Sequence, residues 1–330
     1  MLPRKWILPA VSLCALTSAA QSLAQAPASP METYPSKPLR LIVPFAPGGG
    51  SEVVRIVAQT MSSKTGQQIV IDNRGGAGGL IGAEMAARAN PDGYTVFLGG
   101  SASHGTNPNL YSKLPYDPVK DFRPVTLFAS TPYILTSNPA LPARSVKDLI
   151  VLLKAKAGQL SYSSAGTGST MHLTGEMFKS MAGVDIVHVP YKGGGPAMIA
   201  LLGNEVQIVF NPASVVGPNI KLGKLIALGV TSATRYKLFP DVPTISESGV
   251  PGFEVASWYG ILAPTRTPRD AIRWVNHEVN AALQSPPVRN NFETFGVEPI
   301  GTSPEQFADH IHAELAKWAK VVKVAGIRVE

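Results

Sequence analysis

Short apolar runs alternate along this chain with segments in which apolar residues recur every three or four positions. Residues 41–45, LIVPF, have the pattern of a buried strand, and Val53, Val54, Val57 and Met61 follow with the spacing of one helix face. The same order returns further along, for example where the strand-like QQIVIDNR precedes GGAGGLIGAEMAARA. This alternation predicts an α/β architecture with mostly parallel strands.

Three of the predicted strand-to-helix junctions are rich in glycine and hydroxyl side chains. They contain, in order, Gly48, Gly49, Gly50, Ser51 and Glu52; Ser163, Ser164, Gly166, Thr167, Gly168 and Ser169; and Lys192, Gly193, Gly194 and Gly195. Glycine leaves backbone N–H groups uncovered, and the start of a helix favours an anion. Because open α/β sheets bind ligands at the carboxyl ends of their strands, we expect the junctions to form one anion site. The alternative is that these glycines only permit tight turns.

The N-terminal residues have the three-part pattern of a secretory signal peptide: a basic start, an apolar middle and then small residues. We expect cleavage after Ala24, so that residues 1–24 are the signal peptide and residues 25–33 a mobile leader. A single membrane anchor is the alternative, although the apolar stretch is short for a span. The protein is therefore expected in the periplasm.

Composition narrows the classes of function. The 330 residues, of which 45% are hydrophobic, are enough for about two domains. The single cysteine, Cys14, lies in the expected signal peptide, so the mature chain has no thiol for a disulfide, a nucleophile or a zinc site. Removal of Arg4 and Lys5 lowers the formal net charge from +7 to +5. This favours small anionic ligands, whereas a nucleic-acid binder would have denser basic runs.

The motifs of several enzyme classes are missing from the sequence. The glycine run at Gly48 lacks the third glycine and the acidic partner of a dinucleotide site, and Leu225 stands where a phosphate-binding P-loop needs Ser or Thr. No G-x-S-x-G elbow and no H-E-x-x-H zinc motif occurs. A hydrolase or isomerase with His172 or Glu52 as its base remains the alternative from a different class.

Other distinctive residues have a structural interpretation beside the functional one. His172 and the methionines of its helix are favoured as packing residues over a nucleophile's base or a soft metal site. His310 and His312 are two apart on a predicted helix, which makes a poor metal pair. Arg74 is favoured as a strand-end residue over an anion contact, and Lys192 suits a ligand contact or a solvated loop equally. We therefore expect no metal and no cofactor.

Five segments resemble, in order, the signatures of Bug-type receptors, the extracytoplasmic substrate-binding proteins of tripartite tricarboxylate transporters. They are PFAPGGGSEVVRIVAQ, VIDNRGGAGGLIGAEMAARANPDGYT, YSSAGTGSTMHLTGEMFK, VPYKGGGPAMIALLGNEVQIVF and PDVPTISESGVPGFEVASWYGILAP. The resemblance covers almost the whole mature chain. It implies a two-lobed periplasmic-binding fold of type II, a Venus flytrap, that holds a small carboxylate between its lobes and delivers it to a permease. Glu52 stands where the family usually has Asp.

The pattern and the resemblance together predict two strands on which the chain crosses between the lobes. FRPVTLFASTPYILTSNP leaves the first lobe and FEVASWYGILAP returns to it. We assign residues 34–129 and 256–330 to lobe one and residues 130–255 to lobe two, with the crossing strands as the hinge.

The expected ligand-binding residues come from both lobes. N–H groups and hydroxyls of residues 48–51 and 164–169 are expected to seat carboxylate oxygens, and residues 192–194 to close the site from lobe two. The full set is Phe45, Gly48, Gly49, Gly50, Ser51, Glu52, Ser101, Ser103, His104, Ser164, Gly166, Thr167, Gly168, Ser169, Tyr191, Lys192, Gly193, Gly194 and Asn211. The expected protein is a monomeric receptor that binds no nucleic acid and meets permease subunits transiently. A receptor that serves a sensor system is the alternative.

Overall fold

The computed structural model describes residues 34–44, 50–76 and 79–327, with the backbone alone at residues 50 and 51. Pro35–Glu330 forms one compact unit. The predicted signal peptide, the leader and the predicted ligand contacts Phe45, Gly48 and Gly49 lie outside the described residues.

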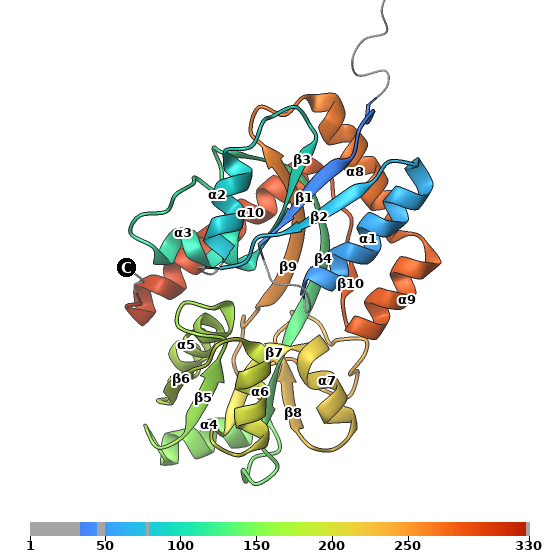
Figure 1. The fold of residues 1–330 in the computed structure, drawn as a ribbon. Coiled ribbons are helices and arrows are strands. Elements are labelled where there is room, and N and C mark those ends of the chain that lie inside the picture. The colour runs from blue at the N-terminus through green and yellow to red at the C-terminus, as the bar shows by residue number, and fades with distance from the viewer. Residues whose placement is uncertain (1–33, 45–49, 77–78, 328–330) are drawn as a thin grey trace, which may run out of the picture. The chain divides into compact units, whose positions relative to one another are not determined.

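Strands and helices alternate over most of this unit, as the sequence predicts (Figure 1). The strands are β1 (Leu39–Val43), β2 (Ile69–Asn73), β3 (Thr95–Gly100), β4 (Phe122–Ser137), β5 (Ser161–Ser164), β6 (Val187–Pro190), β7 (Ile208–Pro212), β8 (Ile226–Val230), β9 (Ala256–Pro264) and β10 (Glu298–Pro299). The helices are α1 (Gly50–Thr65), α2 (Leu80–Ala87), the π-helix η2 (Ala102–Thr106), α3 (Asn107–Leu110), α4 (Val146–Ala155), α5 (Thr170–Ala182), α6 (Gly194–Leu202), α7 (Ala213–Lys221), α8 (Arg269–Leu283), α9 (Pro286–Phe295) and α10 (Pro304–Ala325).

The first sheet has the strand order β2-β1-β3-β9-β4, with β10 also paired to β4. β1 runs parallel to β2 and β3, whereas β9 runs antiparallel to both β3 and β4. The second sheet continues with β4-β7-β5-β6, and β8 also pairs with β4. In it β5 runs parallel to β6 and β7, so the carboxyl ends of these three strands lie on the same edge.

One strand, β4, belongs to both sheets. Its first part pairs with β9 from Phe122 to Pro132, and its second part pairs with β7 and β8 from Tyr133 to Ser137. The prediction of one long strand here is confirmed. The return strand β9 begins at Ala256, opposite Pro132, at the point where β4 passes from one sheet to the other.

Apolar residues form separate cores on the two sheets. Val43, Val57 and Phe128 belong to the core beneath the first sheet, and Tyr162, Phe178 and Phe210 belong to the core of the second. Because each helix presents one apolar stripe to its sheet, the same residues fix the helices on the strands. The described residues contain no helix long and apolar enough to span a membrane.

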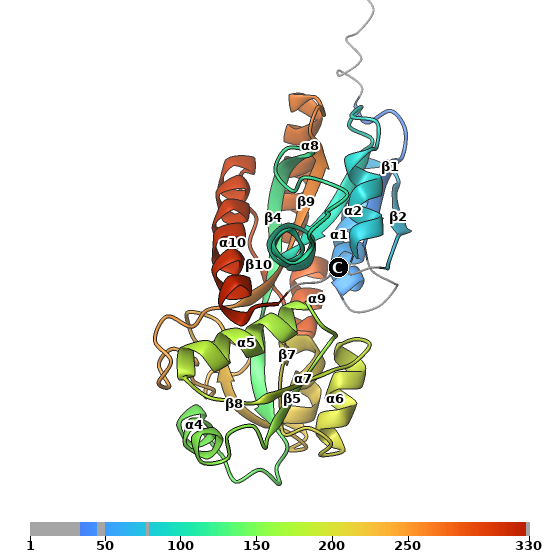
Figure 2. The ribbon, with the colours of Figure 1, turned by 90° about the vertical axis from the view of Figure 1, so that its left-hand side faces the viewer.

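The last helix, α10, packs against both cores. It is amphipathic, as predicted, and begins with a capping box made by Ser303 and Gln306. Phe307, in the first turn of α10, packs with buried residues of the first sheet, whereas Trp318, about three turns further along, packs with the second core and α5 (Figure 2). The C-terminal half of α10 therefore covers the second core, although the sequence analysis assigned all of residues 256–330 to the first lobe.

Candidate functional site

The loop of residues 164–169, called the serine loop below, joins β5 to α5 and has the most hydroxyl groups of the predicted site. Gly166 and Gly168 have φ angles of 123° and 81°, a left-handed backbone that favours glycine. Ser169 caps α5 by accepting a hydrogen bond from His172 N at 3.2 Å. These conformations turn the chain sharply from strand to helix.

Ser164 is fully buried, and its hydroxyl holds the serine loop together. Its Oγ accepts a hydrogen bond from Gly166 N at 3.1 Å and lies 2.6 Å from His188 Nε2. The hydroxyls of Ser164 and Ser169 therefore already have partners inside the protein, which the sequence pattern did not indicate. Thr167, in contrast, is exposed at the tip of the loop.

The next junction, between β6 and α6, lies directly beside the serine loop. Tyr191 N donates to Ser164 O at 3.0 Å, and α6 begins at Gly194 without a side-chain cap. An uncapped first turn leaves N–H groups available to an anion. The Tyr191 hydroxyl donates to Glu205 at 3.1 Å, and exposed Lys192 has no ion-pair partner within the described part of the chain.

Asn211, at the end of β7, connects the third strand to this group. Its Nδ2 donates to Gly194 O at 2.9 Å, while its buried Oδ1 has no partner among the described residues. A Cβ at Gly194 would lie 3.1 Å from that Oδ1, a tight contact that favours glycine at this position. The structure thus brings together the predicted residues at the carboxyl ends of β5, β6 and β7.

The predicted contacts on the first sheet have different surroundings. α1 begins at Gly50, so Gly50 and Ser51 lie in its first turn, whereas the sequence pattern predicted Gly50 in the preceding loop and Ser51 as the N-cap. Glu52 is partly exposed and pairs with Arg55 at 3.5 Å, one turn later on the same helix. The strand predicted over residues 41–45 lies two residues earlier in the chain, because β1 runs from Leu39 to Val43.

Ser101, Ser103 and His104 follow β3, where they are buried and support the fold. Ser101 Oγ accepts a hydrogen bond from Trp258 N at 2.8 Å, which fixes the start of β9. Ser103 Oγ lies 3.0 Å from His104 Nδ1. His104 has no exposed surface, and the rings around it are Phe97, Tyr116 and Phe122. In this structure aromatic side chains enclose the His104 ring, so its contact with a ligand stays a prediction.

Burial controls the charge of the histidines near the site. It lowers the pKa of His104 to about 3. Burial, assisted by the charge of Lys179, lowers the pKa of His172 to about 4, and the Nδ1 of His172 accepts a hydrogen bond from Gly168 N at 3.1 Å. A ring with this pKa and an occupied Nδ1 is a weak general base, so His172 supports the loop, as the packing interpretation predicted.

The sequence analysis missed a group of hydroxyls where the crossing strands meet α5. Tyr133 lies just past the crossing on β4, and its hydroxyl has Ser257 of β9 and Thr170 of α5 as neighbours. Burial is the main reason that the pKa of Tyr133 is raised. Thr170 comes directly after the serine loop, and this position in the sequence could have indicated that its hydroxyl belongs to the same group.

The structure also shows the surroundings of Arg74 and of the methionines of α5. Arg74 pairs with Asp72 at 2.7 Å at the end of β2, in agreement with a structural role. Met171 is buried, but Met181 is 40% exposed and so does not pack in the core as expected for it.

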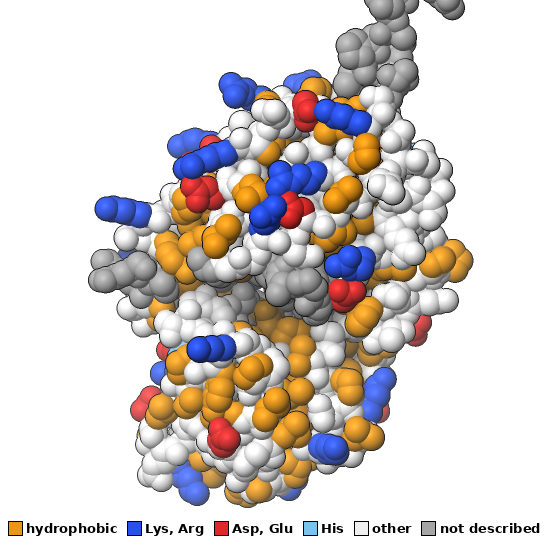
Figure 3. All heavy atoms as spheres, viewed as in Figure 1, with side chains coloured by type: hydrophobic (Ala, Val, Ile, Leu, Met, Phe, Trp, Pro, Cys, Tyr) orange, Lys and Arg blue, Asp and Glu red, His pale blue; other side chains and the backbone are white. Residues whose placement is uncertain are grey.

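No group of three metal-ligating side chains occurs among the described residues. On the face drawn in Figure 3, Lys and Arg side chains lie among acidic ones and form no basic stripe.

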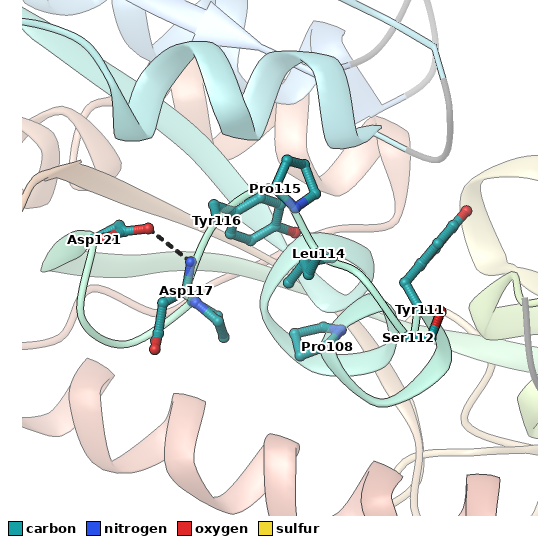
Figure 4. Close-up of a pocket in the computed structure, with 9 residues that line it drawn as sticks. Pro108, Tyr111, Ser112, Leu114, Pro115, Tyr116, Asp117 and Asp121 are labelled. Carbon is teal, nitrogen blue, oxygen red and sulfur yellow. Dashed lines mark hydrogen bonds between the residues drawn. The ribbon is translucent and has the colours of Figure 1, made fainter. Parts of the chain in front are cut away.

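A surface groove of about 580 Å³ is lined by none of the predicted ligand contacts, although one of its lining residues, Tyr116, donates a hydrogen bond to Ser103 O at 2.6 Å (Figure 4). It is lined by segment 108–121, including Tyr111, Tyr116 and Asp117. Asp121 Oδ2 accepts a hydrogen bond from Asp117 N at 2.7 Å, and Asp117 in turn accepts from two backbone N–H groups. These carboxylates are engaged in holding their own turn.

The comparisons with known proteins agree with the resemblance in the sequence. The sequence model of one protein family, the tripartite tricarboxylate transporter family receptor, matches residues 53–327 of this chain. Protein BugT of Bordetella pertussis is 37% identical over 91% of this chain and 92% of its own length.

Two solved structures share both the sequence and the fold. Rpa4515 of R. palustris, solved with adipate, is 39% identical with a TM-score of 0.82, over 89% of this chain and 99% of that one. MatC of Rhodopseudomonas palustris, solved with bound malate, is 32% identical with a TM-score of 0.77, over 88% of this chain and all of that one (100%). The predicted α/β periplasmic-binding-protein fold is confirmed. The chain belongs to the tripartite tricarboxylate transporter receptor family, whose Bug-type members are periplasmic binding proteins.

Proposed function

We propose that the chain is a periplasmic receptor that binds a small organic carboxylate between two lobes and delivers it to a tripartite tricarboxylate-type permease. Lobe one comprises residues 34–129 and 256–330, and lobe two comprises residues 130–255. The observation that carries this proposal is the meeting of three polar junctions at the carboxyl ends of β5, β6 and β7. Open α/β sheets bind their ligands at this edge.

Two kinds of donor are available to a carboxylate there. The uncapped first turn of α6 presents N–H groups at the positive end of the helix dipole. The serine loop adds the exposed hydroxyl of Thr167, and the hydroxyls of Thr170 and Ser257 lie by Tyr133 at the crossing strands. These groups favour an anion that accepts hydrogen bonds, which supports a carboxylate as the ligand.

The ligands of the two solved relatives suggest where to begin a search. Adipate and malate are both aliphatic dicarboxylates. In this chain the α6 first turn would hold one carboxylate, and Lys192, exposed just before α6, would attract the second. We therefore expect aliphatic dicarboxylates to bind more tightly than the corresponding monocarboxylates.

Closure around the ligand is the step that a permease would recognise. Both connections between the sheets meet at the crossing of β4 and β9, so a change at this crossing would move one lobe against the other. A ligand that contacts both lobes favours the closed form by its differential affinity for it. A periplasmic enzyme is disfavoured, because His172 is neutral and its Nδ1 accepts a hydrogen bond from the backbone.

A thermal-shift screen of the purified mature protein tests the binding step. Adipate, malate and their monocarboxylate counterparts are compared, because a ligand at one hundred times its Kd stabilises the folded protein by about 2.7 kcal/mol. We expect a raised Tm with at least one dicarboxylate and unchanged ligand on recovery. Chemical conversion of the ligand would support an enzyme, and no shift with any carboxylate would contradict the proposal. Uptake of the labelled ligand by cells with and without the receptor tests delivery.

A matched pair of glycine variants tests the position of the site. In Gly194→Ala the new Cβ lies 3.1 Å from Asn211 Oδ1 at the start of α6, so the Asn211 side chain must shift and we expect ligand binding to weaken. In Gly203→Ala, at the other end of the same helix, the nearest atom is 3.5 Å away, which is an ordinary contact, so binding is retained. Normal binding by Gly194→Ala would remove the α6 first turn from the site.

A further inference from the structure

Two histidines lie stacked beneath the serine loop. His172 comes from the first turn of α5 and His188 from β6, and their ring centroids are 3.7 Å apart with an interplanar angle of 14°. The Tyr162 ring of β5 lies beside them, 5.0 Å from His188. His172 is only 6% exposed. Three neighbouring elements thus contribute one ring each to the stack.

Each histidine holds one end of the serine loop. Gly168 N donates to His172 Nδ1 at 3.1 Å, and Ser164 Oγ lies 2.6 Å from His188 Nε2. A backbone N–H can only donate, so His172 Nδ1 must be unprotonated for its bond to form. Gly168 has a φ of 81°, a left-handed conformation that glycine adopts readily, and the hydrogen bond to His172 fixes the position of its N–H.

The charged groups around the stack give little net support to protonation of either histidine ring. Lys179 of α5 acts against protonation of both rings, and only Glu176 of α5 favours protonation of His188. Glu176 Oε1 already accepts a hydrogen bond from Tyr162 at 2.7 Å and pairs with Lys179 at 3.3 Å, while Lys179 also reaches Asp185 at 4.0 Å. Burial is the largest cause of a pKa of about 4 for each histidine.

We propose that His172 and His188 are positioning residues that hold the serine loop in its ligand-binding form, and that they do so only as a neutral pair. This inference rests on the proposed function, because it takes the serine loop as part of the carboxylate site. Protonation of His172 Nδ1 places a second donor opposite Gly168 N–H and breaks the bond. Two charged rings stacked face to face would also repel each other. Acid therefore releases the loop, and with it the ligand.

Substitutions at His172 separate positioning from packing. His172→Asn places an amide oxygen near the position of Nδ1, where it can accept from Gly168 N but cannot be protonated at moderate pH. His172→Leu keeps a buried side chain without an acceptor. By calorimetry with the dicarboxylate that stabilises the wild type, we expect Leu to weaken binding at least about tenfold, the size of one lost hydrogen bond. Asn should restore affinity to within about threefold.

The pH profile supplies a readout that a packing role would not change. Acid also protonates the dicarboxylate, so wild type and His172→Asn are compared at each pH with the same ligand. The affinities of the two proteins should change in parallel near neutral pH. As the pH approaches about 4, where the His172 ring takes a proton, the wild type should lose more affinity than His172→Asn. Parallel profiles down to that pH would overturn the proposed requirement for a neutral pair.

A second measurement needs no ligand, and it separates failure of this inference from failure of the proposed function. Ring nitrogen chemical shifts in wild type should show His172 with unprotonated Nδ1, and the Gly168 amide should be protected from hydrogen exchange. His172→Leu should lose that protection, and His172→Asn should keep it. A protonated Nδ1, or equal protection in all three proteins, would overturn the inference even if carboxylates bind. If no carboxylate binds but the loop responds as described, only the proposed function fails.

Discussion

His104 provides a sharp test of how burial controls charge in this fold. The ring has no exposed surface and is enclosed by Phe97, Tyr116 and Phe122, and its Nε2 has no partner among the described residues. It therefore folds in the neutral form, and its pKa falls from 6.5 to about 3. The perturbation is acidification, compared between wild type and His104→Leu, which replaces the ring by an apolar side chain.

The magnitude follows from linkage between protonation and folding. Because the folded-state pKa is the lower one, the unfolded chain takes the proton first as the pH falls. The free energy of unfolding then decreases from about pH 6.5 to about pH 3 and is constant below that range. At about 1.36 kcal/mol per pKa unit, His104 alone lowers it by roughly 2.5 kcal/mol between about pH 7 and about pH 4.5.

The assay is urea unfolding of both proteins at the two pH values. The stability of His104→Leu at neutral pH reflects packing and is not the quantity of interest. We expect wild type to lose roughly 2.5 kcal/mol more than the variant on acidification, since His172, His188 and the carboxylates contribute equally to both. Losses that agree within about 0.5 kcal/mol would refute the argument, and would mean that His104 is solvated or finds an anionic partner.

Two further substitutions test packing and capping. Gly260→Ala places a Cβ in overlap with the Phe307 ring, between β9 and α10, so we expect a loss of about 1–3 kcal/mol of stability by urea unfolding. A loss near zero would mean that α10 shifts freely. Ser169→Ala removes the cap on His172 N, which should cost about 1 kcal/mol, and Ser169→Asp should recover most of it. Equal stabilities of the Ala and Asp variants would show that the cap contributes little.

The sequence was sufficient for the elements whose signals are local. Apolar runs and helical spacing predicted β1 and α1, and the pattern from Phe122 onward, together with the family resemblance, predicted β4 as one strand. The glycine-rich junctions were correctly expected at the ends of strands, and those of the second sheet do lie together.

The parts that could not be predicted depend on contacts between distant residues. The segment after β3, SASHGTNPN, is polar enough for an exposed loop, yet it is buried because Phe122 and Trp258 arrive from other strands to cover it. The partners of Ser164 likewise follow from the position of β6, which carries His188 24 residues later. Local periodicity contains no information about such neighbours.

The pairing of β4 with β9 also affects how the family can vary. Ser130 lies opposite Trp258, so each rung of this ladder closes a chain segment that contains the entire second sheet. The entropy cost of closing a loop grows only with the logarithm of its length, by about 0.6 kcal/mol for each doubling. Insertions or deletions in the enclosed segment therefore change the stability of the first sheet very little. Related chains can therefore differ in length at the loops that follow β5, β6 and β7 while β4 and β9 keep their lengths.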